Sequence, residues 1–595
     1  MDEHTALHNP TPPKEGDSEI RNPRLTVESG LYAAIVALAL AVRLFRLGLA
    51  PLSTSEAQLA LAAWRGTAPP IGSSPLLYWI SALLFAVFGS SDGLARLVPA
   101  LAGSALVALP IFWRERIGRV GAMGAAAILA ISPAAITTSR TLSGEALVAA
   151  IMVGLVAVVD RYLQTGHAAW LYAGAALLGL GLASGTGIYS ALVILLISAG
   201  LVAALGPAGE AREKWQAVRA APGLAWRLIG VMVAVFAACA TALMWRPGGL
   251  GGAIDLLSTW LAGFQSQASV TQWYWPFQLL MVYEPLALGV GLVGLFLASA
   301  RGHRFVGLLI AWLVVAALLA VIRSARASGD VLFMVIPLAM LGGYALEALA
   351  DSLRAMRFSA EEGVLMLVVL PVVAYFMLGL TAYINNPNAI LPLTGRLDLG
   401  PVAQVIPMFL AVALMGILIT LFAALTTAEV ALRGAVLTAL VTLVLVTWAA
   451  GWGMAQSHPG DPRELMAGPA TTAPAVRNLV RDLSTLSANT TTDPHMLSFV
   501  VQSPPDGVLG WYLRDMPNAQ FMTTLDASSA PPVLVTTDSK PPALSGSYAG
   551  QRFTLQHEWR VEGRPTYDVL KWLVYRTAEL PKPTQQAILW VQQGQ

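Results

Sequence analysis

Two acidic residues lie in polar segments between apolar runs and could take part in proton transfer. Glu56 lies in the stretch RLGLAPLSTSEAQLALAAWRG, and Glu145 ends the stretch TTSRTLSGE. A carboxylate within hydrogen-bond reach of a hydroxyl group can act as its general base. Each acid could instead stabilise a helix N-terminus, where a negative charge complements the helix dipole, and Ser53, Thr54 or Ser55 could cap the first of these helices.

Three arginines in similar polar segments could bind an anionic group. Arg140 shortly precedes Glu145, and Arg323 and Arg326 lie in the stretch VIRSARASGD. Because a guanidinium group pairs well with phosphate, a phosphate-bearing lipid is a suitable ligand for all three. The alternatives are contact with ordinary lipid head groups for Arg323 and Arg326, and an interfacial anchor or an ion pair for Arg140.

The stretch QWYWPFQLLMVYEP contributes a third group of candidate residues. Trp273, Tyr274 and Tyr283 could stack on a sugar or a prenyl chain, although aromatic residues also gather at membrane interfaces in general. Glu284 lies about two turns into an apolar run, where an ionisable group is costly and often functional. Pairing with a buried arginine is the alternative for this acid.

The composition shows that membrane helices must position these residues. Of the 595 residues, 56% are hydrophobic and 12% are charged, whereas soluble chains carry about 25% charged residues. Because a spanning helix needs about 20 apolar residues, the apolar runs predict about thirteen spans. They cover residues 30–48, 94–113, 118–137, 146–163, 168–184, 186–205, 228–245, 276–299, 306–322, 331–350, 363–383, 401–425 and 433–455. The net charge of +2 gives no reason to expect a nucleic-acid partner, and a single cysteine, Cys239, excludes an intrachain disulfide.

Positive charge predicts the side of the membrane on which each loop lies. Residues 75–89 are apolar but number only about 15, so we expect them to lie along the outer interface rather than to span. With that choice the basic loops fall on the cytoplasmic side, where Lys and Arg collect. These loops cover residues 113–119, 212–227, 300–304 and 351–357. Glu56 and Glu145 then share the outer face, where we predict that they line one cavity.

The polar ends of the chain predict three domains. Residues 1–29 are typical of a disordered cytoplasmic tail, residues 30–455 form the transmembrane domain, and residues 456–595 form a small extracytoplasmic α/β domain. In the last of these, strand-like runs such as LSFVVQ and RFTLQHEW alternate with helical patterns. We expect it to cover or shape the outer mouth of the transmembrane domain. No His, Asp and Glu set has metal-ligand spacing, and we expect no cofactor.

The order of several motifs resembles GT-C membrane glycosyltransferases of family 39, the dolichyl-phosphate-mannose protein mannosyltransferases and aminoarabinose transferases. The motifs are RLGLAPLSTSEA, PLLYW, ARLVPAL and SPAAITTSRTLSGEAL. The stretches QWYWPFQLLMVYEPLAL, DPREL and WYLRD are similar to a subgroup sometimes labelled flippase-associated. The Asp-Glu pair of the family reads Ser55-Glu56 here, so the Asp usually assigned as catalytic base is a serine.

The resemblance implies a multi-pass protein of the plasma (inner) membrane with a GT-C-like domain of helices. It implies transfer of a sugar from a polyprenyl phosphate to a protein, lipid or glycan acceptor at the outer face, with inversion at the sugar carbon. Glu56 and Glu145 are then the catalytic carboxylates. The donor-binding residues are Arg140, Arg323, Arg326, Trp273, Tyr274, Tyr283 and Glu284. The alternative is a catalytically degenerate relative that binds or helps to handle lipid-linked sugars.

Overall fold

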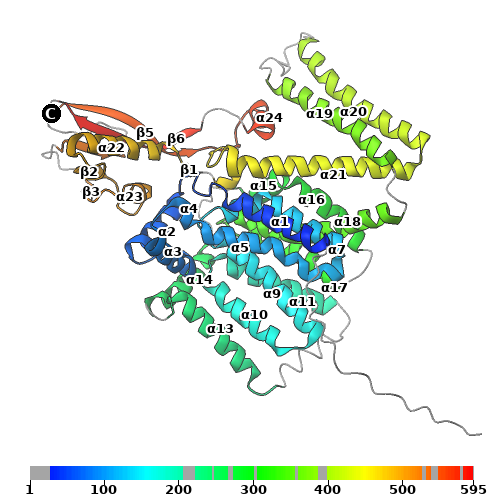
Figure 1. Ribbon diagram of the computed structural model, residues 1–595, viewed down its shortest axis with the longest axis horizontal. Coiled ribbons are helices and arrows are strands. Elements are labelled where there is room, and N and C mark those ends of the chain that lie inside the picture. The colour runs from blue at the N-terminus through cyan, green and yellow to red at the C-terminus, as the bar shows by residue number, and fades with distance from the viewer. Residues whose placement is uncertain are drawn as a thin grey trace, which may run out of the picture.

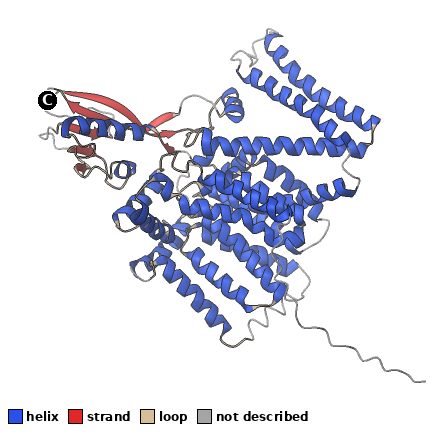
Figure 2. Cartoon of the chain, viewed as in Figure 1, coloured by secondary structure: helices blue, strands red, loops and turns tan. Residues whose placement is uncertain are grey.

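A bundle of helices and a smaller mixed-sheet domain form the molecule (Figures 1 and 2). The computed structural model describes residues 27–205, 221–243, 247–265, 272–299, 304–355, 360–385, 399–468, 470–524, 531–537, 547–576 and 581–593. Residues 1–26 of the predicted tail, which covers residues 1–29, lie outside the described residues. Three of the four predicted cytoplasmic loops lie partly or mostly outside them.

The first part of the bundle runs to residue 205. It contains α1 (Val27–Leu44), α2 (Thr54–Arg65), α3 (Pro75–Phe88), α4 (Asp92–Ala95), α5 (Leu97–Ala108), η1 (Leu109–Trp113), α6 (Arg114–Ile117), α7 (Arg119–Ile131), α8 (Pro133–Ser139), α9 (Glu145–Thr165), α10 (Ala168–Leu182) and α11 (Gly187–Leu205). The candidate acids Glu56 and Glu145 lie in the first turns of α2 and α9.

The second part of the bundle leads into the C-terminal domain. It contains α13 (Leu224–Ala240), η2 (Pro247–Leu250), α14 (Gly251–Ala262), α15 (Trp275–Tyr283), α16 (Pro285–Ser299), α17 (Arg304–Ile322), η3 (Ser328–Val331), α18 (Leu332–Ala355), α19 (Ala360–Asn385), α20 (Leu399–Leu425), α21 (Ala428–Trp452), η4 (Gly453–Ser457) and η5 (Leu465–Ala467). The pair α19 and α20 projects from the bundle at the far end of α21 (Figure 1).

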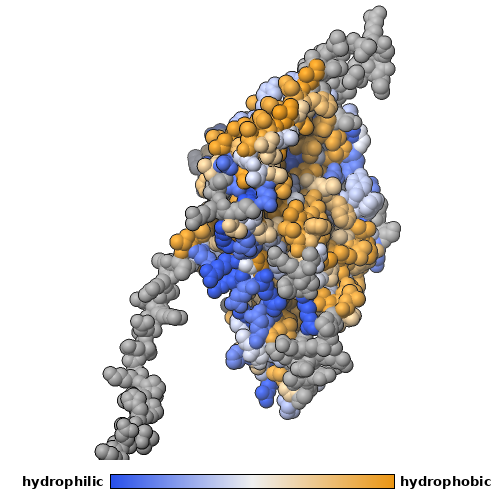
Figure 3. Space-filling model, turned by 90° about the vertical axis from the view of Figure 1, so that its right-hand side faces the viewer, coloured by the Kyte–Doolittle hydropathy of each residue, from blue (hydrophilic) through white to orange (hydrophobic). Residues whose placement is uncertain are grey.

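Nine helices within the described residues are long and apolar enough to cross a membrane, and eleven if each of two bent pairs is one span. The chain is therefore a multi-pass membrane protein, and apolar side chains cover much of the face seen in Figure 3. Three shorter apolar helices are α3, α10 and α13. The count of about thirteen spans, like the interfacial position of α3, remains a prediction.

The core of the bundle lies around α18, the most deeply buried of the nine spans among the described residues. Close contact requires small residues: a Cβ on Gly294 of α16 would lie 1.8 Å from the carbonyl oxygen of Leu341. Helices in membranes commonly use small residues to approach in this way, because van der Waals packing replaces the hydrophobic effect there.

Glu284 joins the two bent pairs, α7–α8 and α15–α16, which bend by 58° and 96°. This fully buried acid lies at the second bend and accepts hydrogen bonds from the Ser132 hydroxyl at 2.6 Å and the Ala134 amide at 2.8 Å. Pro133 begins α8, where its missing N–H group costs nothing. Glu284 thus caps α8 and stabilises the break that precedes Arg140.

The C-terminal domain, residues 456–593, contains a six-stranded mixed sheet in the order β1-β5-β6-β4-β2-β3. Its elements are β1 (Ala470–Thr472), α22 (Ala475–Thr491), β2 (Phe499–Gln502), α23 (Val508–Tyr512), β3 (Ala519–Met522), β4 (Val533–Thr536), β5 (Tyr548–Glu558), α24 (Thr566–Tyr575) and β6 (Lys582–Gln592). Strand β2 pairs in parallel with β3 and β4, and the remaining pairs are antiparallel. This confirms the α/β domain expected from the sequence.

The C-terminal domain packs directly on α2 and α3. Leucines of both helices share one hydrophobic cluster with Trp511, whose ring centroid lies 5.6 Å from that of Phe85. Asp92 fastens the contact by accepting hydrogen bonds from Trp511 Nε1 at 2.8 Å, the Tyr512 hydroxyl at 2.8 Å and Arg477 Nη2 at 2.6 Å. The two domains therefore share a continuous hydrophobic core and a group of hydrogen bonds to Asp92.

Candidate functional site

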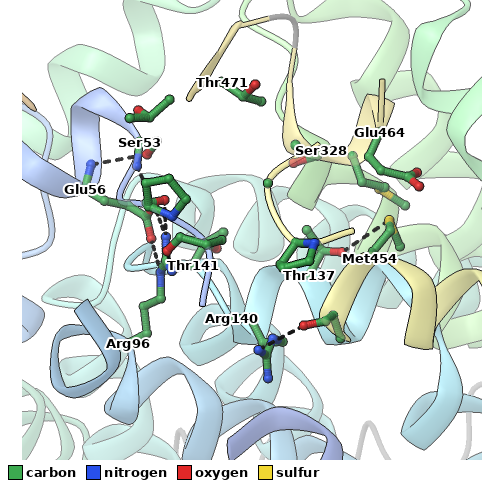
Figure 4. Close-up of a pocket in the computed structure, with 18 of the residues that line it drawn as sticks. Ser53, Glu56, Arg96, Thr137, Arg140, Thr141, Ser328, Met454, Glu464 and Thr471 are labelled. Carbon is green, nitrogen blue, oxygen red and sulfur yellow. Dashed lines mark hydrogen bonds and ion pairs between the residues drawn. The ribbon is translucent and has the colours of Figure 1, made fainter. Parts of the chain in front are cut away.

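A pocket of about 170 Å³ lies where the bundle meets the C-terminal domain (Figure 4). We call its two sides the bundle wall and the C-terminal wall. The bundle wall comes from the loops around α2, α5 and α8 and from η3, and includes Ser53, Glu56, Arg96, Thr137, Arg140 and Ser328. The C-terminal wall comes from residues 454–472 and includes His458, Glu464, Thr471 and Thr472.

Glu56 reaches the bundle wall through the capping of α2. The Ser53 hydroxyl accepts a hydrogen bond from the Glu56 amide at 3.4 Å, and the Glu56 carboxylate accepts one from the Ser53 amide at 2.8 Å. This reciprocal arrangement is a capping box, which satisfies two amides that a helix start would otherwise leave unpaired. The Ser-x-x-Glu spacing of the sequence is thus a helix-start signal.

Glu56 is also half of a buried ion pair. Arg96 donates from Nε and Nη2 to its two oxygens, both at 2.8 Å, and the Leu142 amide donates at 2.6 Å. Burial raises the pKa of the Glu56 carboxyl, but Arg96 and the backbone hydrogen bonds outweigh burial and hold this pKa below its ordinary value. A carboxylate with so low a pKa is a weak proton acceptor, because an effective base has a pKa near the working pH.

Arg96 and Arg140 donate hydrogen bonds to backbone carbonyls, most of them at the end of α1 or in the loop that follows it. Arg96 donates from its terminal nitrogens to the carbonyls of Ala50 at 2.8 Å and Pro51 at 3.0 Å. Arg140 donates to five carbonyl oxygens, those of Val42, Arg43, Phe45, Arg46 and Ala455. Because a helix leaves its last carbonyls without partners, Arg140 closes the end of α1 and ties it to the segment after α21.

The hydrogen bonds of Arg140 therefore indicate a mainly structural role. Burial, together with the nearby charge of Arg96, lowers the pKa of its guanidinium to about 10. Both terminal nitrogens of Arg140 donate to backbone carbonyls, and donor-phosphate binding by this residue stays a prediction. Its positive charge still contributes to the pocket it lines.

Glu145 is in different surroundings from Glu56. It does not line the pocket but lies against η3, where a Cβ on Gly329 would lie 2.1 Å from its Oε2 atom. In the same loop Arg323 pairs with Asp330 at 3.0 Å. The prediction that Glu56 and Glu145 line one cavity is therefore corrected: η3 contributes Ser328 to the pocket, and Glu145 packs against that loop.

Four further predicted donor-binding residues also lie off the pocket wall. Arg326 donates to the carbonyls of Ala320 and Val321 at the end of α17, while Arg323 borders a separate small cavity. Trp273 and Tyr274 are exposed just before α15, with ring centroids 5.8 Å apart. Their positions agree with the alternatives of head-group contact and an aromatic belt as well as with donor binding.

Tyr283, by contrast, connects the bundle to the C-terminal wall. It is fully buried, donates to Glu464 Oε2 at 2.7 Å, and accepts from the Leu465 amide at 3.0 Å. Arg576 lies 3.8 Å from the same carboxylate oxygen and stacks over the Tyr283 ring at 4.7 Å. The VYEP and DPREL stretches therefore meet at the pocket.

Glu464 is a pocket residue that the sequence analysis missed. Burial raises the pKa of its carboxyl, and the positive charge of Arg576 opposes that rise only in part. Its position within DPREL, one of the stretches similar to the flippase-associated subgroup, was the signal that could have identified it. Within the described residues, no group of three or more His, Cys, Asp or Glu side chains could hold a metal ion.

Comparisons with known proteins agree with this architecture. Residues 70–245 match the family described as dolichyl-phosphate-mannose-protein mannosyltransferase. The structure resembles ArnT from Cupriavidus metallidurans in the apo state, with a TM-score of 0.52 and 16% identity over 86% of this chain and 94% of that one. It also resembles ArnT bound to undecaprenyl phosphate, with a TM-score of 0.54 and 14% identity over 94% and 98% of the two chains. No curated protein matches the sequence. The family match over residues 70–245 and the shared fold confirm the resemblance noted in the sequence, and the chain has the fold of a GT-C glycosyltransferase.

Proposed function

We propose that the pocket binds a polyprenyl-phosphate-linked sugar and that the chain transfers this sugar to an acceptor at the outer face of the membrane. In this proposal the N-terminus is cytoplasmic and the C-terminal domain is extracytoplasmic, in the plasma (inner) membrane. The observation that carries it is the position of the pocket, at the junction of an apolar bundle with a polar domain in a GT-C fold. A lipid tail could stay in the membrane while its head group enters that pocket. The ArnT structure with undecaprenyl phosphate gives a relative of the same fold with such a lipid bound.

The reaction needs one proton acceptor. The acceptor hydroxyl oxygen forms a bond to the anomeric carbon, the bond from that carbon to the phosphate oxygen breaks, and the hydroxyl proton passes to a carboxylate. Polyprenyl phosphate leaves with the bonding electrons, so a strong general acid is not needed. Of the two carboxylates on the pocket wall among the described residues, Glu464 has the raised pKa and is the better acceptor near neutral pH.

A second candidate function is binding of lipid-linked sugars without transfer. Two observations favour it: Glu56 is committed to Arg96, and Ser55 is an exposed serine where the family has Asp. This alternative keeps the same pocket and the same ligand class. It differs only in whether bound donor is turned over.

One experiment separates these two functions. Purified protein in nanodiscs is given undecaprenyl phosphate mannose, glucose, galactose or arabinose, and both lipid binding and release of undecaprenyl phosphate are measured. Transfer predicts release that is lost in Glu464→Gln even at lipid concentrations that saturate binding to this variant. Glu361→Gln changes an exposed acid at the start of α19 and is the unaffected control. Binding without release supports the second function. Absence of binding to every lipid would contradict both.

A further inference from the structure

Two buried hydroxyl groups on the C-terminal wall have no hydrogen-bond partner among the described residues. Thr471 is 7% exposed and Thr472 is 4% exposed, both line the pocket, and the Oγ1 atom of each is unpaired. A buried polar group without a partner costs about 1–3 kcal/mol, and such groups are few in native structures. Their place beside a pocket suggests that a ligand supplies the missing partners.

The two hydroxyls lie on β1, close to a further buried polar atom. Strand β1 is at the edge of the sheet and pairs only with β5, where Thr471 lies opposite His557. Nδ1 of that histidine is also buried without a partner. Figure 4 shows Thr471 at the rim of the pocket, between Ser53 and Glu464.

Glu464 gives the same wall a fixed hydrogen-bond acceptor. Its Oε2 atom is held by Tyr283, whereas no described residue donates a hydrogen bond to Oε1. On the facing wall, Ser328 and Thr141 contribute further hydroxyl groups. These hydroxyl groups and the Glu464 carboxylate therefore match a ligand with several hydroxyl groups. The negative charge of the carboxylate disfavours an anionic ligand group next to it.

We propose that Glu464, Thr471 and Thr472 form a subsite that binds the hydroxyl groups of an uncharged or cationic glycosyl group and so helps to select the sugar. The proposal rests on the proposed function, because it takes the pocket to be part of a protein that binds sugars. The glycosyl group can belong to the lipid-linked donor or to a glycan acceptor, because both present the same hydroxyl chemistry.

The donor arm of the test compares undecaprenyl phosphate with undecaprenyl phosphate mannose, glucose, galactose and arabinose, each binding to protein in nanodiscs. The wild-type protein should bind at least one sugar-bearing lipid more tightly than undecaprenyl phosphate. Thr471→Val with Thr472→Val should weaken that complex by about tenfold, and Glu464→Gln by about tenfold or more. Affinity for undecaprenyl phosphate should not change. Thr485→Val removes a hydroxyl that bonds to the Arg481 carbonyl on exposed α22, and it serves as the matched control.

The acceptor arm uses the methyl glycosides of the same four sugars without lipid. If a methyl glycoside binds to the wild-type protein and this binding is lost in the threonine double variant, the result supports a subsite for acceptor sugars. This conclusion holds even if no lipid binds and the proposed use of a lipid donor fails. The subsite is overturned if neither arm shows a preference for sugar, or if the double variant keeps the full preference. Donor preference without turnover leaves the subsite in place and contradicts only the transfer function.

A stability measurement separates a binding role from a structural one. If these hydroxyls have no protein partner, replacing them by methyl groups should leave the thermal midpoint of the ligand-free protein unchanged or raise it. A clear fall in this midpoint would show that the hydroxyls stabilise the fold. That outcome would overturn the proposal.

Discussion

The two walls of the pocket satisfy their polar groups in different ways. On the bundle wall Glu56 accepts four hydrogen bonds, and the terminal nitrogens of Arg96 and Arg140 are taken by the protein. On the C-terminal wall Thr471 and Thr472 have unpaired hydroxyls, and one Glu464 oxygen accepts no hydrogen bond from the described residues. A satisfied network specifies a structure, whereas an unsatisfied one costs stability and is retained mainly at functional sites.

The comparison assigns different roles to residues that look alike in the sequence. Glu56 and Glu464 are both buried acids beside an arginine, yet their pKa values shift in opposite directions. The difference follows from geometry: Arg96 makes two hydrogen bonds of 2.8 Å to Glu56, whereas Arg576 lies 3.8 Å from Glu464. The nearer arginine therefore stabilises the charged carboxylate enough to outweigh burial.

The largest expected effect comes from breaking the satisfied wall. Arg96→Met leaves Glu56 buried and unpaired and releases the loop carbonyls of Ala50 and Pro51. Removing one partner of a buried ion pair typically costs about 3–5 kcal/mol, so the thermal midpoint of the purified protein should fall by several degrees. Tryptophan fluorescence on heating measures this midpoint.

The double variant Glu56→Gln with Arg96→Met controls for the loss of arginine packing. It removes both charges of this ion pair, so it should be more stable than Arg96→Met alone, in which Glu56 keeps a buried charge without a counter-charge. If the two substitutions destabilise additively instead, the ion pair is not a coupled unit and the contrast between the walls is wrong.

A smaller effect should follow from separating the two walls. Asp92→Ala removes the acceptor shared by Trp511, Tyr512 and Arg477. Hydrogen bonds to charged groups contribute about 1.5–3 kcal/mol each, and solvent access reduces this at the domain edge. Hydrogen exchange should become faster in α22 and α23, while exchange in α18 stays unchanged. Asp482→Ala removes an acid that bonds only within the C-terminal domain, and it should leave the domain contact intact.

Local signals allowed much of the fold to be predicted. Apolar runs gave the long helices, the polar shift near residue 456 gave the α/β domain, and Ser53 with Glu56 matches a capping-box pattern. Each of these features depends on residues close together in the chain. The family match and the GT-C fold confirm the motif resemblance.

The site was harder to predict because its contacts join distant segments. The prediction that Glu56 and Glu145 lie on one face of the membrane did not give the distance between them. In the structure Glu145 contacts η3, whereas Glu56 pairs with Arg96. The pairing of Tyr283 with Glu464 depends on how α15 meets the segment after α21. Sequence patterns identify both stretches but contain no information on their contact.

The smallest expected effect is a difference in pH dependence that tests the opposite pKa shifts. The folded pKa of Glu56 is lowered, so its contribution to stability is present above the unfolded value of about 4.3 and is lost as the pH falls through the folded pKa. Glu56→Gln should therefore lower the thermal midpoint at pH 7, and this deficit should shrink only as the pH falls below about 4.

Glu464 should behave in the opposite way. Its folded pKa is raised by burial, against the charge of Arg576 and with Tyr283, Asp461 and His458 as its other charged or titratable neighbours. The fold then loses stability as the pH rises from about 4.3 through the folded pKa. Glu464→Gln cannot ionise, so its midpoint should match that of the wild type near pH 4 and exceed it at pH 8. A Glu464→Gln deficit that grows with pH would mean that the carboxylate is as firmly paired as Glu56, and the two walls would then not differ.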